Sequence, residues 1–165
     1  TMATPNELIQ TDILCQWGIK AYGKDIDSKF PDIDTSNNRP GFDILVQKND
    51  NTLCTIQSKL RQVRGRTDFS RQIDFETTRR HGKKNKGAAS SSGHVAYGTD
   101  EFDYVLISLI NVRNDLSNRS NVDKWSFSLI PSKELIDETK GCCFTHIPSK
   151  ILKKYKIDSN NPPSF

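Results

Sequence analysis

FDILVQKNDNTLCTIQSKL, residues 42 to 60, carries the strongest structural signal in this chain. Two segments rich in apolar and β-branched residues, 42–46 and 53–60, flank the polar residues KNDN at 48–51. Such a pattern is typical of two antiparallel strands joined by a short turn. The stretch therefore predicts a β-hairpin.

The second predicted strand carries polar side chains near its end. Side chains alternate between the two faces of a strand, so Gln57 and Lys59 share one face while Ser58 points to the other. Asp43 begins the neighbouring strand, so we expect a carboxylate, an amide oxygen and an ammonium to converge near one edge of the hairpin. Oxygen ligands of this kind bind divalent cations, and a lysine beside a hard cation suits phosphodiester hydrolysis, in which charge builds on the phosphoryl oxygens.

The segments on either side of the hairpin predict helices and further strands. Thr4-Pro5-Asn6-Glu7 has the form of a helix start with a capping box, and an apolar stripe follows as far as Gly18. The nearly continuous apolar run at 102–112 fits a strand buried on both faces. Four more elements are expected: a short strand or helix within 70–80, a strand at 125–130, a short helix around Leu135 and a helix at 150–155. Within 70–80 the alternation of Ile73 and Phe75 favours the strand.

This order of elements, α-β-β-(β)-loop-β-β-α, predicts an α/β fold in which helices flank a mixed β-sheet. A chain of 165 residues suits a single domain spanning 1–165. The polar tail from about residue 156 is expected to be loose.

Positive charge is concentrated in one segment. Ten Lys or Arg residues lie between Lys59 and Lys86 against three acidic residues, a local balance of +7 in a chain whose net charge is +4. The remainder of the chain therefore carries about −3. A basic segment in an otherwise near-neutral chain indicates a site for an anionic partner, and the alternative is a solvated loop.

Composition argues against several other classes. No apolar run approaches the length of a membrane span, and no secretory segment opens the chain. The four cysteines lack zinc-like spacing, and two of them are adjacent. Reduced thiols in a cytoplasmic protein, with no membrane partner and no organic cofactor, are the expectation.

The segments PGFDILV and TIQSK together resemble the PD-(D/E)XK nuclease superfamily, in particular its small homing-endonuclease and restriction-endonuclease-like members. Asp43 takes the place of the first acidic residue, and Gln57-Ser58-Lys59 that of the (D/E)XK half. The stretches AYGTDEFDYVLISLI and WSFSLIPSKEL resemble the later strands and the closing helix of such domains. The likeness extends over most of residues 5 to 138.

The resemblance implies a divalent-metal-dependent endonuclease acting on double-stranded DNA, of the homing or restriction type. Its metal would be Mg²⁺, with Mn²⁺ as a substitute, held by Asp43 and Gln57. Lys59 would orient or activate the attacking water and stabilise the developing charge. The first helix of such nucleases often supplies a glutamate, so Glu7 is either an outer ligand or only the capping partner of Thr4.

Two departures from the family pattern bear on the site. Gln57 stands where the family usually has an acidic residue, which keeps an oxygen ligand but weakens metal binding and leaves open whether one or two metals bind. The literal Pro-Asp pair is Pro31-Asp32, in a turn-rich segment without a strand. Asp43 is preferred to Asp32 because catalytic groups need a rigid mount.

DNA contacts are assigned to the basic segment. Arginine matches the guanine edge in bidentate fashion, so some of these residues would read bases while the rest hold phosphates. The candidates are Arg61, Arg64, Arg66, Arg71, Arg79, Arg80, Lys83 and Lys84. A domain of this size that cuts both strands needs a second copy, so a homodimer or homotetramer is expected.

Two other functions remain open from the sequence. A non-catalytic DNA-binding or assembly module could keep the fold and lose the chemistry, which the neutral Gln57 favours and the presence of both Asp43 and Lys59 opposes. A junction resolvase or repair nuclease would share the site and differ in the shape of DNA it prefers.

Overall fold

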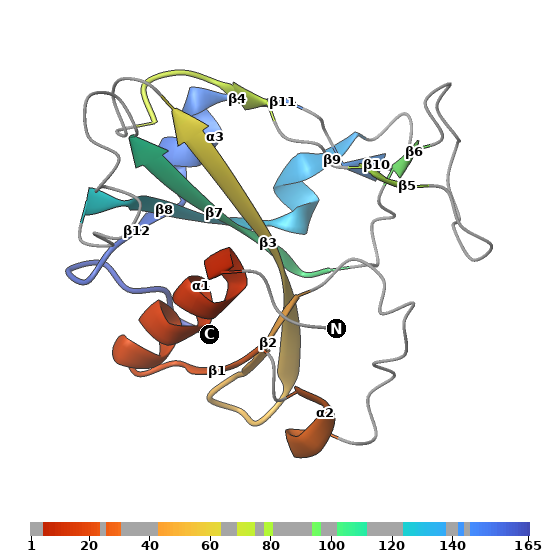
Figure 1. The fold of residues 1–165 in the computed structure, drawn as a ribbon, viewed down its shortest axis with the longest axis vertical. Coiled ribbons are helices and arrows are strands. Elements are labelled where there is room, and N and C mark those ends of the chain that lie inside the picture. The colour runs from red at the N-terminus through yellow and green to blue at the C-terminus, as the bar shows by residue number, and fades with distance from the viewer. Residues whose placement is uncertain are drawn as a thin grey trace.

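The computed structural model describes residues 5–23, 26–30, 43–63, 69–74, 78–80, 94–96, 102–111, 124–137, 142–143 and 146–165. Over these residues the fold is mixed α/β, built on a six-stranded sheet with the strand order β1-β2-β3-β7-β8-β12 (Figure 1). Its strands are β1 (Lys20–Tyr22), β2 (Ile44–Gln47), β3 (Leu53–Val63), β7 (Tyr104–Asn111), β8 (Ser126–Pro131) and β12 (Lys156–Ile157).

The hairpin predicted at 42–60 is confirmed as β2 and β3. The two strands are antiparallel, with Ile44 opposite Ile56 and Gln47 opposite Leu53. Asn51 in the turn has a φ of 67°, the left-handed conformation that asparagine tolerates better than most residues. β3 runs three residues further than predicted, as far as Val63, so the start of the basic segment is part of the strand.

The centre of the sheet is the parallel pair β3–β7. Ile56 lies opposite Tyr104 and Val63 opposite Asn111, while β7 is antiparallel to β8 on its other side. The six described side chains from Val105 to Ile110 are all buried, which confirms the prediction of a strand covered on both faces. Asp103 fixes the start of β7, because its carboxylate accepts a hydrogen bond from the Thr55 N–H at 2.9 Å.

Helices cover both faces of this sheet (Figure 1). On one face, α1 (Pro5–Gln16) packs with Leu14 over an apolar cluster that includes Ile56 and Leu106. On the other, α3 (Ser149–Lys154) and the 3₁₀ helix η3 (Ser132–Leu135) contribute Leu152 and Leu135 to a second cluster. The predicted helices at these three places are confirmed, and the sheet has an apolar core on each side.

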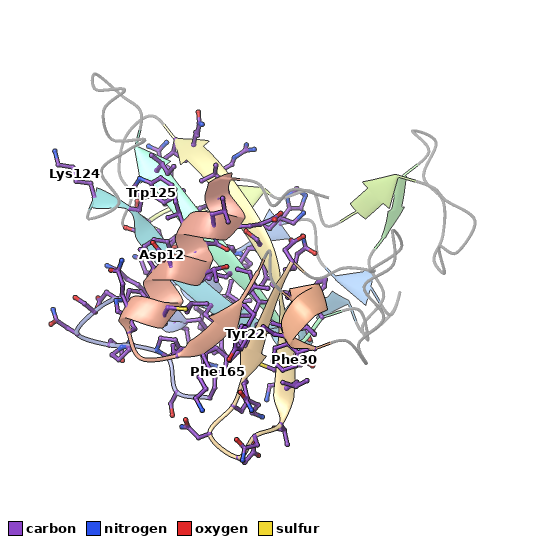
Figure 2. All side chains as sticks on the ribbon, turned by 60° about the horizontal axis from the view of Figure 1, so that its bottom comes forward. Asp12, Tyr22, Phe30, Lys124, Trp125 and Phe165 are labelled. Atoms are coloured by element: carbon purple, nitrogen blue, oxygen red, sulfur yellow. The ribbon has the colours of Figure 1, made fainter. Side chains whose placement is uncertain are left out.

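Smaller elements surround the main sheet. The short helix α2 (Ile26–Lys29) is followed by Phe30, whose ring packs edge-on against that of Tyr22 at 5.0 Å (Figure 2). The strand predicted within 70–80 is present in two pieces that belong to separate two-stranded sheets. The pairs are β4 (Ile73–Asp74) with β11 (His146–Ile147), β5 (Thr78–Arg80) with β6 (His94–Ala96), and β9 (Ile136–Asp137) with β10 (Cys142–Cys143).

The prediction of a loose tail from about residue 156 is wrong for this structure. β12 extends the main sheet by pairing with β8, and Ile157 is buried in the cluster under α1. The ring of Phe165 packs edge-on against Tyr104 at 5.5 Å, and its carbonyl accepts a hydrogen bond from the Asn49 N–H. β12 is only two residues long and forms by pairing with β8.

Two further observations concern membrane crossing and the Cys54 thiol. None of the helices in the described part of the chain combines the length and the apolar character that crossing a membrane requires. Burial raises the pKa of the Cys54 thiol to about 11, with the nearby Asp103 carboxylate adding to the shift.

Cys54 is therefore expected to resist alkylation by iodoacetamide at pH 8 in the folded protein, because the thiolate is the nucleophile and is scarce there. Cys15 is exposed and serves as the internal comparison. Mass spectrometry of peptides from timed reactions should find Cys15 modified first by at least about tenfold. Equal rates would contradict a buried, protonated Cys54.

Candidate active site

Asp43 lies immediately before β2, where it faces the middle of β3. Its backbone N–H donates to the Ile56 carbonyl at 2.9 Å, which continues the hairpin ladder. Its carboxylate Oδ2 accepts two hydrogen bonds, from the Ser58 N–H at 3.0 Å and from the Gln57 side-chain nitrogen at 2.9 Å. Asp43 and Gln57 therefore meet as expected, but the contact is made by the amide nitrogen rather than by the amide oxygen.

Gln57 is oriented by two acceptors. Its Nε2 donates to the Asp43 carboxylate and, at 3.4 Å, to the Ser58 carbonyl. Neither a carboxylate nor a carbonyl can donate, so both contacts require the nitrogen and direct the amide oxygen away from Asp43. The side chain is 8% exposed, so this orientation is set within a nearly closed environment.

Lys59 shares a face of β3 with Gln57. In the ladder to β7, Gln57 is opposite Val105 and Lys59 is opposite Ile107, and both of these β7 residues belong to the apolar cluster under α3. Ser58 points to the other face, where its hydroxyl accepts a hydrogen bond from Asn6 of α1 at 2.8 Å. Lys59 is half-buried on the face that it shares with Gln57, which also carries apolar side chains of β7.

Glu7 is in the first turn of α1, directly after the residue that bonds to Ser58. α1 covers the face of the sheet to which Ser58 points, whereas Gln57 and Lys59 lie on the opposite face. Thr4, the expected capping partner of Glu7, lies outside the described residues. Asp32 is outside them as well.

The helix contributes two polar residues that sequence reasoning missed. Asn6 and Gln10 lie one turn apart on α1, and both are buried against the sheet. Gln10 Nε2 contacts three acceptors: Ser108 Oγ at 2.7 Å, the Leu106 carbonyl at 3.1 Å and the Lys59 carbonyl at 3.3 Å. Their spacing of four residues within an apolar helical stripe was the available signal, because it puts both on the face that packs against the sheet.

The candidate site offers few possible ligands for a metal ion. Among the described residues, no group of three or more His, Cys, Asp or Glu side chains could hold a metal ion. Mg²⁺ usually keeps several waters and takes one or two carboxylates from the protein, so a set of one carboxylate and one amide oxygen fits a hydrated Mg²⁺. The Gln57 amide would first have to turn its oxygen toward the ion, which exchanges its contact with Asp43 for a metal bond.

The predicted DNA-contacting residues are placed only in part. Arg61 is exposed near the end of β3, and Arg71 is exposed just before β4. The backbone of Arg79 and Arg80 forms β5, paired with His94 and Val95 of β6. The other four candidates, Arg64, Arg66, Lys83 and Lys84, lie outside the described residues.

Comparisons of the chain with protein-family models, with curated proteins and with solved structures found no match. The candidate site consists of a half-buried carboxylate, Asp43, the Gln57 amide bonded to it, and Lys59 two residues further along the same strand face as Gln57.

Proposed function

We propose that this protein is a Mg²⁺-dependent endonuclease that hydrolyses phosphodiester bonds of double-stranded DNA, with the restriction-endonuclease-like arrangement of the PD-(D/E)XK superfamily. One observation carries the proposal. Asp43 bonds to the backbone of Ser58 and to the side chain of Gln57, so the carboxylate is held at a fixed position on the strand that presents Lys59. A nuclease of this class needs a carboxylate and a lysine in such a relation.

Each residue would have a defined part in the reaction. Asp43 and the turned Gln57 amide would hold Mg²⁺, with Glu7 as an outer ligand. The ion supplies neutralisation of phosphoryl charge and a water of lowered pKa. The Lys59 ammonium would lie beside the scissile phosphate, where it orients the attacking water and stabilises the charge that develops on the phosphoryl oxygens.

The second candidate is a DNA-binding or assembly module without catalysis. The Gln57–Asp43 hydrogen bond favours it, because an amide that donates to the carboxylate satisfies that charge without a metal. The presence of Lys59 on the same strand face as Gln57 opposes it, because a module without catalysis has no need of a lysine beside Asp43. A junction resolvase or repair nuclease would use the same groups on DNA of another shape.

For the endonuclease and for a DNA-binding module alike, the proposed partner is duplex DNA. The basic segment that starts at Arg61 would hold phosphates, and Arg64 or Arg66 would read bases in the major groove, because each follows closely after the strand that carries Lys59. A homodimer or homotetramer would bring two such sites to the two strands of the duplex.

Arg61→Ala is expected to weaken binding to random and selected duplexes alike and to lower the slope of log affinity against log salt by about one unit, because one phosphate contact and its released counterion are lost. Fluorescence anisotropy at several salt concentrations measures both quantities. Lys156→Ala is the matched control, since Lys156 is also exposed but lies on the edge strand β12.

An Arg61→Ala protein with unchanged affinity and slope would remove this residue from the interface. Arg64→Ala or Arg66→Ala should have a different effect from Arg61→Ala. Each should cost about 1–3 kcal/mol of DNA-binding free energy, and only on the preferred site. If neither they nor Lys83→Ala changed binding, the basic segment would be a solvated loop.

The catalytic proposal is tested by incubating the purified protein with supercoiled plasmid in Mg²⁺ and in EDTA. Conversion to nicked and linear forms in Mg²⁺ alone is the expected result. Retarded but intact plasmid in both solutions would favour the non-catalytic module.

A further inference from the structure

The contact between α1 and the strand that carries Lys59 is polar at its centre. Asn6 Nδ2 donates to Ser58 Oγ at 2.8 Å, and Gln10 Nε2 reaches the Lys59 carbonyl as well as Ser108 and Leu106 of β7. Gln10 is fully buried and Asn6 is 8% exposed. A helix lying on a sheet normally makes this kind of contact with apolar side chains.

The polar contact is costly for stability. Within the described part of the chain, Asn6 Oδ1 and Gln10 Oε1 are buried and have no hydrogen-bond partner. A buried polar atom without a partner loses its hydration and gains nothing in return, whereas an apolar pair of the same shape would avoid that loss. Departures from good packing of this kind are found mainly where function requires them.

The contacts converge on three consecutive residues of β3. From the hairpin side, Asp43 holds the Gln57 side chain and the Ser58 N–H. From the helix side, Asn6 holds the Ser58 hydroxyl and Gln10 contacts the Lys59 carbonyl. The backbone that carries the Lys59 side chain is therefore held from two directions, by Asp43 beside β2 and by α1 on one face of the sheet.

We propose that Asn6 and Gln10 are positioning residues for Lys59: through β3 they fix where the ammonium lies relative to Asp43. The inference rests on the proposed nuclease function and deepens it. Displacement of a catalytic group by about 1 Å can cost about a hundredfold in rate, so a clamp on the strand backbone acts on the chemical step. Asn6 and Gln10 are buried between α1 and the sheet and would make no contact with DNA, so substituting them should leave DNA affinity unchanged.

Gln10→Met tests the clamp, because methionine keeps the volume and removes the donor. We expect the single-turnover cleavage rate at saturating protein to fall at least about tenfold, with the DNA dissociation constant within about twofold of wild type. The melting temperature reports stability separately, because the substitution removes one unpartnered oxygen but also leaves the buried Ser108 Oγ without its donor. A merely structural role predicts an unchanged rate at equal DNA occupancy, whatever the stability.

Ser108→Ala is the matched control. It removes the shortest of the Gln10 contacts, on β7, and leaves the contact with Lys59. We expect its rate within about twofold of wild type. The ¹³C chemical shift of the Lys59 carbonyl gives a readout independent of activity, and it should move in Gln10→Met and stay in Ser108→Ala.

Asn6 supplies a second pair of variants should Gln10→Met not fold. Asn6→Leu removes the contact with Ser58 and should slow cleavage, whereas Asn6→Asp should restore it because the Ser58 hydroxyl can donate to a carboxylate. If wild type cuts DNA and both Gln10→Met and Asn6→Leu cut at its rate, the positioning role is overturned and the nuclease function stands. If wild type does not cut in Mg²⁺, the nuclease function falls and this inference falls with it.

Discussion

Asp43→Asn is expected to abolish cleavage while the protein remains folded and binds DNA. The asparagine carbonyl can still accept the hydrogen bonds that Oδ2 receives from Ser58 and Gln57, so the hairpin keeps its geometry. The negative charge that would hold Mg²⁺ is lost. We expect the cleavage rate to fall by at least about a hundredfold, as when a single group that stabilises transition-state charge is removed.

Asp103→Asn is the matched control for this change. Asp103 Oδ2 accepts the Thr55 N–H of the same strand at 2.9 Å, close to the 3.0 Å of the Asp43–Ser58 contact, but Asp103 stands before β7 rather than at the proposed site. Single-turnover cleavage, circular dichroism and DNA affinity of both variants should be compared with wild type. Equal rates in wild type and Asp43→Asn would remove Asp43 from the chemistry.

Gln57→Glu is expected to make stability depend on divalent metal. A carboxylate at this position cannot donate to Asp43, so two like charges would be held together in a nearly buried site. Without metal we expect the free energy of unfolding to fall by about 1–3 kcal/mol. For a chain of this size, each kcal/mol lowers the melting temperature by about 2–4 °C. Mg²⁺ at 100 times its dissociation constant would return about 2.7 kcal/mol.

Thermal unfolding in EDTA and in Mg²⁺, with calorimetric titration of Mg²⁺, measures the effect. Gln57→Glu should bind Mg²⁺ more tightly than wild type, and Gln57→Ala should bind it more weakly. The effect on cleavage rate has no fixed sign, because added charge also repels the scissile phosphate. Gln62→Glu, at an exposed position of β3, controls for charge alone. Equal Mg²⁺ affinities in wild type, Gln57→Glu and Gln57→Ala would remove Gln57 from the metal ligands.

The local elements were predictable because their signals are local. The hairpin follows from two apolar segments around a turn, and the central strand β7 from an unbroken apolar run. The edge strands β1 and β12 gave no such signal, because each is only two or three residues long and exists by pairing with a longer neighbour. The parallel pairing of β3 with β7 joins segments about 48 residues apart and has no local signature.

The site was predictable on one face of β3 only. Alternation along the strand places Gln57 and Lys59 together, and the short turn brings Asp43 to them. Alternation cannot say what covers the other face. Gln10 and Ser108 each lie within an apolar pattern. Their contact could not be predicted, because the two residues are about a hundred positions apart in the sequence. The direction of the Gln57 amide could not be predicted either, since only the two acceptors around it fix which end faces Asp43.

The catalytic role of Lys59 is the centre of the proposed function, and one comparison tests it most directly. Lys59→Met keeps an apolar side chain of similar length at the position opposite Ile107 and removes the charge. Wild type and variant are each saturated with one duplex in Mg²⁺, and the rate of phosphodiester cleavage is measured in a single turnover. We expect wild type to cut and Lys59→Met to cut at least about a hundred times more slowly at equal DNA occupancy. Equal cleavage by the two proteins would contradict the proposed active site.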